Sequence, residues 1–249
     1  MNKLFLGFSK TVELPPGNFL FIDDEVPDIA KARIFDPTKS SFNPLHALDY
    51  KHARDLAEVL YTTTPQGENT LTVRNGKRAL LQALLTKPPK KTHRLDNLQG
   101  TEEVEDMIAD LLASPVLKHT FCNPLTPFSF KKNSVILARI NRAELGDFDA
   151  LVLGLVLINH YKGQLVIPDF GFYGRAVHSN LIRQQRLIAG VNYLAELPLQ
   201  LRRSVLSIQD VTPSTTLHED AEILAEYAGY AKGTVGFSDF VKAAISSPL

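Results

Sequence analysis

The sequence predicts an α/β fold in which a mainly parallel sheet is flanked by helices and carries a helical insertion. From residue 134 onward, short apolar runs alternate with longer segments of helical spacing. Such alternation is typical of parallel strands joined by crossover helices. The segment from about 49 to 130 instead shows helical spacing throughout. We therefore expect a single domain over residues 1–249, with the helical insertion at about 49–130.

Three short strands are expected before the insertion. They cover residues 3–8, 18–23 and 32–35. The prolines and the glycine of residues 13–17 predict a turn between the first two. The second strand stops at the acidic residues Asp23, Asp24 and Glu25. A carboxylate cluster at a strand end is either a site for a cation or phosphate chemistry or a solvated loop, and the sequence leaves both interpretations open.

Helices are expected to fill the insertion. Asp49 can cap a first helix with its apolar residues on one face, a second helix is expected after Asn75 and Gly76, and Thr101 can cap a third. Between the last two, residues 86–100 hold paired prolines and a basic run, which together indicate an exposed connection. The basic run is either solvated surface or a contact for nucleic acid.

Strands and helices then alternate to the end of the chain. The expected strands are 135–138, 164–168, 187–191 and 205–208, and the expected helices are 148–160, a segment after Pro198, 219–227 and 238–245. The most apolar run, 150–158, has less than half of the roughly 20 residues that a membrane-spanning helix needs. We therefore expect it to be a buried helix of a soluble core.

Charge and cysteine content exclude several classes of protein. Lys plus Arg and Asp plus Glu number 27 each, so no global positive field attracts nucleic acid or an anionic membrane. The lone Cys122 excludes an internal disulfide and a multi-cysteine metal site, and it fits a reducing compartment. The histidines are too scattered along the chain to predict a zinc site. A cytoplasmic location is the expectation.

Three stretches resemble the FtsK and HerA superfamily of hexameric DNA translocases, in particular its type IV secretion coupling proteins. The first joins Phe35-Asp36-Pro37 with Phe42-Asn43-Pro44-Leu45, the second is residues 49–85, and the third is residues 163–209. They occur in the family's order across most of the chain. The resemblance implies a RecA-like ATPase fold in a DNA translocation, conjugation or packaging system.

The resemblance assigns roles to two residues at strand ends. Asp169, after the apolar run 165–168, matches the Walker B acid that orients magnesium and its water. Asn192, after the run 187–191, matches the polar residue that senses the γ-phosphate. The family's second acid, which polarises the attacking water, is replaced here by Phe170.

The phosphate-binding loop departs further from the family's pattern. A working loop reads G-x-x-x-x-G-K-[ST] and opens a helix. The nearest stretch supplies Gly7, Lys10 and Thr11, but Ser9 stands where a glycine is needed and Leu4 occupies the first glycine position. The paired prolines at 15 and 16 leave room for scarcely one helical turn.

Arginines near the strand ends are candidates for a site shared between subunits. Arg183 and Arg186 precede the strand 187–191, where a hexamer presents an arginine to its neighbour's nucleotide; Arg139 and Arg142 follow another strand. Each is either such a residue or ordinary surface. The resemblance thus implies a degenerate ATPase-like protein with weak or absent hydrolysis, using ATP and magnesium if active. Self-association or another protein subunit is expected, and DNA is a candidate partner. The alternative is a noncatalytic interaction or assembly scaffold.

Overall fold

The computed structural model describes residues 3–6, 14–46, 48–63, 70–86, 94–130, 133–174, 187–206, 210–212 and 217–246. Its internal contacts divide the chain into two compact units. The first unit contains Met1–Ile22 and Gly163–Leu249, and the second contains Asp23–Lys162. Each unit is described by itself below.

A parallel sheet forms the centre of the first unit. Its strands are β1 (Lys3–Leu6), β2 (Phe19–Asp23, whose last residue opens the second unit), β5 (Gln164–Ile167), β6 (Leu187–Val191) and β7 (Asp210–Thr212). They lie in the order β2-β5-β6-β1-β7, and each neighbouring pair is parallel. All five residues of β6 are buried, as expected for a strand covered on both faces.

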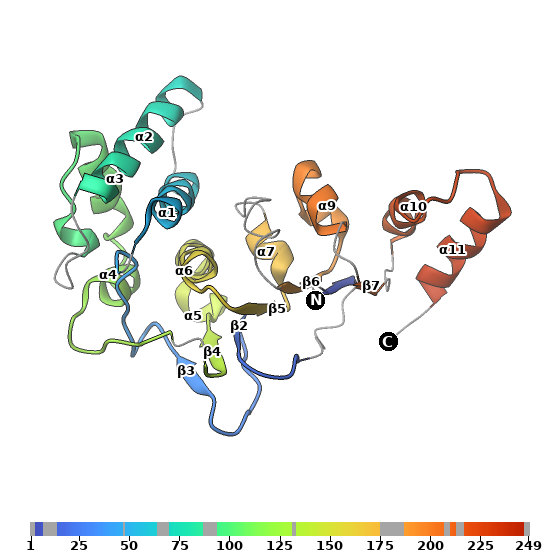
Figure 1. The fold of residues 1–249 in the computed structure, drawn as a ribbon, viewed down its shortest axis with the longest axis horizontal. Coiled ribbons are helices and arrows are strands. Elements are labelled where there is room, and N and C mark those ends of the chain that lie inside the picture. Colours follow the sequence, from blue (N-terminus) through green and yellow to red (C-terminus); the bar gives the residue numbers. More distant parts are fainter. Residues whose placement is uncertain are drawn as a thin grey trace. The chain divides into compact units, whose positions relative to one another are not determined.

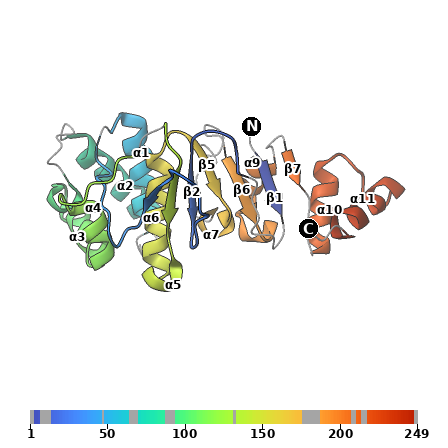
Figure 2. The same ribbon diagram turned by 90° about the horizontal axis from the view of Figure 1, so that it is seen from below.

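Helices of the first unit follow its strands. They are α7 (Phe170–Gly174), the short 3-10 helix η2 (Leu194–Glu196), α9 (Leu199–Leu206), α10 (His218–Tyr227) and α11 (Val235–Ser246). Figure 1 shows α7 and α9 on the same face of the strands. The last two helices pack on each other through Ala221, Ala225, Phe237, Val241 and Ala244 (Figure 2).

The second unit combines a strand pair with helices. Strands β3 (Arg33–Phe35) and β4 (Ile136–Arg139) are parallel neighbours. The helices are α1 (Tyr50–Thr63), α2 (Thr70–Thr86), η1 (Leu95–Asn97), α3 (Glu102–Leu111), α4 (Pro115–Cys122), α5 (Arg142–Leu145) and α6 (Asp147–His160). Helix α1 packs against α2 and α6. Helix α6 is buried from Val152 to Asn159, because its apolar residues occupy every face.

The α/β fold with parallel strands and flanking helices is confirmed, and the apolar run 150–158 is the buried helix α6 as predicted. Within the described residues, every helix is too short or too polar to cross a bilayer. The arrangement as one domain with an insertion at about 49–130 stays a prediction.

Helices α5 and α7 are not among the predicted elements, and two predicted elements differ in their extent. Val205 and Leu206 belong to helix α9 instead of a strand, and the last strand is β7. The helix begins where the carbonyl of Pro198 accepts hydrogen bonds from the amides of Leu201 and Arg202, and a short apolar run at its end cannot be told from a strand by spacing.

The second difference concerns Gly76, which lies inside helix α2 instead of in a turn before it. An added Cβ at Gly76 would stand 2.1 Å from the hydroxyl oxygen of Tyr61 on α1. The glycine therefore serves the close packing of the two helices, a contact that local sequence does not reveal.

Candidate functional site

The carboxyl ends of β5, β6 and β1 meet at one edge of the sheet in the first unit (Figure 2). The register aligns Ile167 with Ala189 and Leu6 with Val191. The described residues that follow β5 and β6 therefore emerge side by side. In open parallel sheets, ligands bind outside the carboxyl ends of the strands, so this edge is the first place to look for a site.

Asp169 occupies this edge as the sequence predicts. It is half-buried in the turn between β5 and α7. The next residue, Phe170, is 1% exposed and part of the core. A core side chain therefore stands at the position where the resemblance predicts an acid.

Asn192 lies at the same edge, directly after β6, and it contacts a second acid. Its Nδ2 donates a hydrogen bond of 3.4 Å to Oε1 of Glu196, at the long end of the accepted range. The other oxygen, Oε2 of Glu196, is buried and accepts no hydrogen bond from the residues that the structure describes. The edge therefore holds a carboxylate that the sequence analysis did not assign to it.

Two glycines make room for this arrangement. An added Cβ at Gly171 would stand 2.0 Å from Oε2 of Glu196, and one at Gly190 would stand 2.0 Å from the carbonyl oxygen of Pro168. Real Cβ contacts essentially never come this close. The glycines allow α7 and β6 to approach, so that the Glu196 carboxylate lies against the backbone two residues after Asp169.

The turn that carries Glu196 is anchored from α10. The amide of Leu194, at the start of η2, donates a 2.8 Å hydrogen bond to Oδ2 of Asp220. Asp220 is 2% exposed, and burial raises the pKa of its carboxyl above the usual value. At the other end of the turn, Arg202 Nε donates a 2.8 Å hydrogen bond to the carbonyl of Leu197. Glu196 is therefore held by contacts on both sides of its turn.

The chemistry of this edge fits a magnesium ion bound together with phosphate and water. Mg²⁺ prefers oxygen ligands and is usually held by one or two carboxylates plus substrate phosphates and waters. Asp169 supplies a half-buried carboxylate at this edge, and Oε1 of Glu196 supplies a second carboxylate oxygen beside Asn192. Within those residues, no group of three or more His, Cys, Asp or Glu side chains is arranged to hold a metal by protein ligands alone.

The remaining predicted site residues lie outside the described residues. These are Gly7, Lys10 and Thr11 of the phosphate-loop candidate, and the arginine candidates Arg183 and Arg186. Glu196 is the residue that the sequence analysis missed. The one sequence feature that points to Glu196 is its position four residues after Asn192, which follows an apolar strand. Such a spacing is too common to identify a site without the fold.

The other arginine candidates pair within the second unit. Arg142 Nη2 lies 3.0 Å from Oδ2 of Asp24, and Arg142 Nε donates to both oxygens of that carboxylate. Arg139 Nη2 donates to Oε1 of Glu144 at 2.7 Å. Asp24, in the acidic cluster after β2, thus has an arginine partner.

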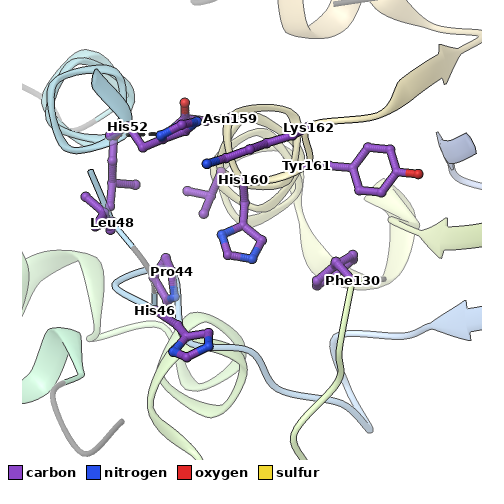
Figure 3. A pocket seen from close by; sticks show the side chains of 11 residues that line it. Pro44, His46, Leu48, His52, Phe130, Asn159, His160, Tyr161 and Lys162 are labelled. Atoms are coloured by element: carbon purple, nitrogen blue, oxygen red, sulfur yellow. Dashed lines mark hydrogen bonds between the residues drawn. The ribbon is translucent and has the colours of Figure 1, made fainter. Parts of the chain in front are cut away.

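A separate pocket of about 190 Å³ lies in the second unit. His160 points into it between Phe130 and His46 (Figure 3). Burial lowers the pKa of His160 to about 4, and the nearby charges of His46, Lys162 and His52 lower it further. None of the described residues that line this pocket carries a carboxylate. Its lining therefore does not match a magnesium site, and the sheet edge of the first unit is the stronger candidate.

The fold and this edge define a RecA-like α/β protein with acidic and amide side chains at the carboxyl ends of its strands. No protein-family model and no curated protein matches the chain. Among solved structures, VirB4 of Thermoanaerobacter pseudethanolicus is similar with a TM-score of 0.57 and 10% identity, over 93% of this chain and 82% of that one.

The bacterial conjugative coupling protein TrwBdeltaN70 is similar with a TM-score of 0.53 and 12% identity, over 90% of this chain and 71% of that one. TrwB in complex with the non-hydrolysable GTP analogue GDPNP gives a TM-score of 0.52 and 13% identity, over 90% and 73%. At these identities the likeness shows a shared fold. It confirms the fold that the resemblance to coupling proteins predicted.

Proposed function

We propose that this chain is a degenerate P-loop ATPase-like subunit of a DNA translocation, conjugation or packaging system, which binds nucleotide and hydrolyses it weakly or not at all. The observation that carries the proposal is the position of Asp169, Asn192 and Glu196 at one sheet edge. It is supported by a fold shared with a conjugative coupling protein and with a structure solved around a GTP analogue.

Each predicted residue has a role in this proposal. Asp169 orients magnesium, which supplies positive charge against the phosphates when bound. Lys10 and Thr11, after Gly7, contact the phosphates, and Asn192 senses the terminal one. Arg183 and Arg186 reach the nucleotide of a neighbouring subunit, which requires self-association or a second protein. DNA is the proposed cargo or track.

Weak hydrolysis follows from the departures in the sequence. Ser9 and Leu4 stand where glycines allow backbone amides to approach the phosphates, and Pro15 follows closely. Phe170 replaces the acid beside Asp169 and is buried. These changes weaken both the binding of phosphate by the loop and the activation of water. We therefore expect the chain to bind nucleotide but to hydrolyse it slowly or not at all.

A cytoplasmic location is part of the proposal. Cys122 is the only cysteine of the chain and is buried. Burial raises the pKa of its thiol to about 11, so that the reactive thiolate is scarce at neutral pH. A lone, unreactive thiol fits a reducing compartment.

Calorimetric titration with ATP, in magnesium and in EDTA, tests the proposal. We expect the wild type to bind ATP. Lys10→Ala should bind ATP at least about tenfold more weakly, because an ionic contact with phosphate is removed. Binding by Asp169→Ala should no longer depend on magnesium. Glu219→Gln, on the exposed side of α10, is the matched control. A wild type that binds no ATP under either condition would contradict the proposal.

The alternative function is a noncatalytic scaffold, and one observation favours it. The α10 and α11 pair exposes large apolar side chains, with Val235 78% exposed, Tyr227 51% and Tyr230 43%. Exposed apolar surface of this kind is typical of protein contacts. Light scattering measures this assembly. If the chain binds no nucleotide and assembles fully without it, the result favours the scaffold.

A further inference from the structure

We propose that the pocket of the second unit binds a phenol-type ring, whose hydroxyl forms a hydrogen bond with the imidazole of His160. None of the described residues that line this pocket belongs to the sheet edge of the first unit. The inference therefore goes beyond the proposed nucleotide site and does not depend on it.

The size and the walls of the pocket are the first argument. Its volume is about 190 Å³, whereas an apolar cavity of roughly 150 Å³ already binds benzene. Leu48, Leu56, Phe130 and Val156 give the pocket apolar walls. It therefore has the space and the surface that a single aromatic ring needs.

The imidazole of His160 is the second argument. Its centroid lies 5.4 Å from that of the Phe42 ring and 5.8 Å from that of the Phe130 ring, so aromatic packing holds it in place. The imidazole points into the pocket (Figure 3), and no described residue forms a hydrogen bond with its nitrogens. A ligand that enters the pocket therefore meets an unpaired polar group on a fixed ring.

Other polar groups of the lining are less open to a ligand. Oδ1 of Asn159 has no hydrogen-bond partner among the described residues, but it is buried in the protein. Nδ1 of His52 hydrogen-bonds to Asp49, and His46 lies on the exposed rim. His160 is therefore the polar group that a ring meets inside the pocket.

The protonation state of His160 selects a hydroxyl as the polar group of the ligand. Burial, with the charges of His46, Lys162 and His52, lowers the pKa of His160 to about 4, so the imidazole is neutral at pH 7. A neutral imidazole has one donor nitrogen and one acceptor nitrogen. A hydroxyl both donates and accepts, so it can pair with whichever nitrogen faces it.

The charges around the pocket disfavour an ionic ligand. None of the described lining residues is an acid, so a cation finds no counter-ion there. Nζ of Lys162 lies 3.8 Å from Oδ2 of Asp49, so an anion would have to compete with that carboxylate. Burying a charge without a partner costs more than burying a hydroxyl. A neutral ring with one hydroxyl is therefore the class of ligand that the pocket fits.

NMR titration of the whole chain at pH 7 with p-cresol and with toluene tests the inference, because the two molecules differ only by the hydroxyl. p-Cresol should bind about two- to tenfold more tightly than toluene, the range that one net hydrogen bond gives. The charged analogues 4-methylbenzoate and 4-methylbenzylamine should each bind at least about tenfold more weakly than p-cresol, since each loses the hydration of a charge.

His160→Phe is the matched variant, because a phenyl ring keeps the packing against Phe42 and Phe130 and lacks both nitrogens. It should bind toluene within about twofold of the wild-type affinity and lose the preference for p-cresol, since only the hydrogen bond is removed. His218→Phe, which changes an exposed histidine on α10, is the control and should keep the preference. Circular dichroism should show that both variants are folded.

A phenol ring reaches the pocket as a free small molecule or as a tyrosine side chain of a second copy, and sedimentation velocity distinguishes these sources. Saturating p-cresol should dissociate assembled wild-type protein if a tyrosine of a second copy occupies the pocket, and it should leave sedimentation unchanged if the ligand is a free phenol.

Three results would overturn the inference. They are wild-type protein that binds p-cresol no more tightly than toluene, p-cresol that shows no saturable binding, and His160→Phe that keeps the preference for p-cresol. A wild type that binds no ATP would contradict the proposed function and leave this inference standing, because the two rest on different residues.

Discussion

Gly171 and Glu196 approach each other so closely that a methyl group on Gly171 would stand 2.0 Å from the carboxylate oxygen Oε2. The contact joins the first turn of α7 to the end of η2. It fixes where the carboxylate lies relative to the end of β5, so the identity of residue 171 bears on both stability and function.

Gly171→Ala should lower the free energy of unfolding by about 1 kcal/mol at most, below the usual cost of overpacking, because the Glu196 carboxylate is the end of a flexible side chain and can move aside. The gain in helix propensity, about 1 kcal/mol, opposes this cost. In a Glu196→Ala background the obstacle is gone, and the same substitution should be neutral or stabilising. Urea unfolding followed by circular dichroism measures both; equal costs in the two backgrounds would contradict the described packing.

Gly190→Ala should cost more, about 3 kcal/mol, because the atom that it meets is a backbone oxygen. An added Cβ would stand 2.0 Å from the carbonyl of Pro168, which cannot rotate away as a side chain can. Glu196→Ala should not relieve this cost. Urea unfolding measures this cost as well. A decrease in the free energy of unfolding of less than about 1 kcal/mol for Gly190→Ala would mean that β5 and β6 separate easily.

Asp220→Asn should change how stability depends on pH. Burial raises the folded-state pKa of Asp220 above its usual value of 3.8. The contribution of this carboxyl to stability is therefore greatest below pH 3.8 and is lost as pH rises through the folded-state pKa. The asparagine can still accept from Leu194 but does not titrate in this range. The variant should therefore gain stability relative to the wild type between pH 4 and pH 7, measured by thermal unfolding. Asp239→Asn, on the exposed face of α11, is the control, and a difference independent of pH would contradict the prediction.

His160→Gln should remove a loss of stability at acid pH. Burial, with the charges of His46, Lys162 and His52, lowers the folded-state pKa of His160 to about 4 from 6.5. Its contribution is present above pH 6.5 and is lost as pH falls towards 4, by about 3 kcal/mol at most. The difference in the free energy of unfolding between wild type and His160→Gln should therefore shrink from pH 7 through pH 5.5 to pH 4, as measured by unfolding curves. The exposed control His218→Gln should show the same pH dependence as the wild type.

Arg142→Lys should lower the free energy of unfolding by about 1 kcal/mol. The guanidinium contacts both oxygens of Asp24, a two-point contact that an ammonium group cannot reproduce. Arg139→Lys is the matched control, because its pair with Glu144 is more exposed and surface pairs contribute little. Equal effects of the two substitutions in urea unfolding would contradict the distinction.

The sequence by itself determined the elements whose signals are local. Strands β5 and β6 and helix α6 could be predicted because apolar period and run length are properties of neighbouring residues. The Walker B candidate Asp169 could be found for the same reason, since it directly follows an apolar strand. The helix through Gly76 and the true extent of α9 could not, because contacts made elsewhere in the chain decided them.

Only the tertiary structure decided how the candidate site is assembled. The order β5-β6-β1 places the carboxyl ends of strands from distant segments at one edge of the sheet. The spacing of residues in the sequence does not reveal that order. The position of Glu196 depends on the absence of a side chain at Gly171 and on the hydrogen bond that Asn192 donates to its Oε1. A sequence shows which residue follows Asp169, whereas the packing of a loop against a helix decides which carboxylate lies beside it.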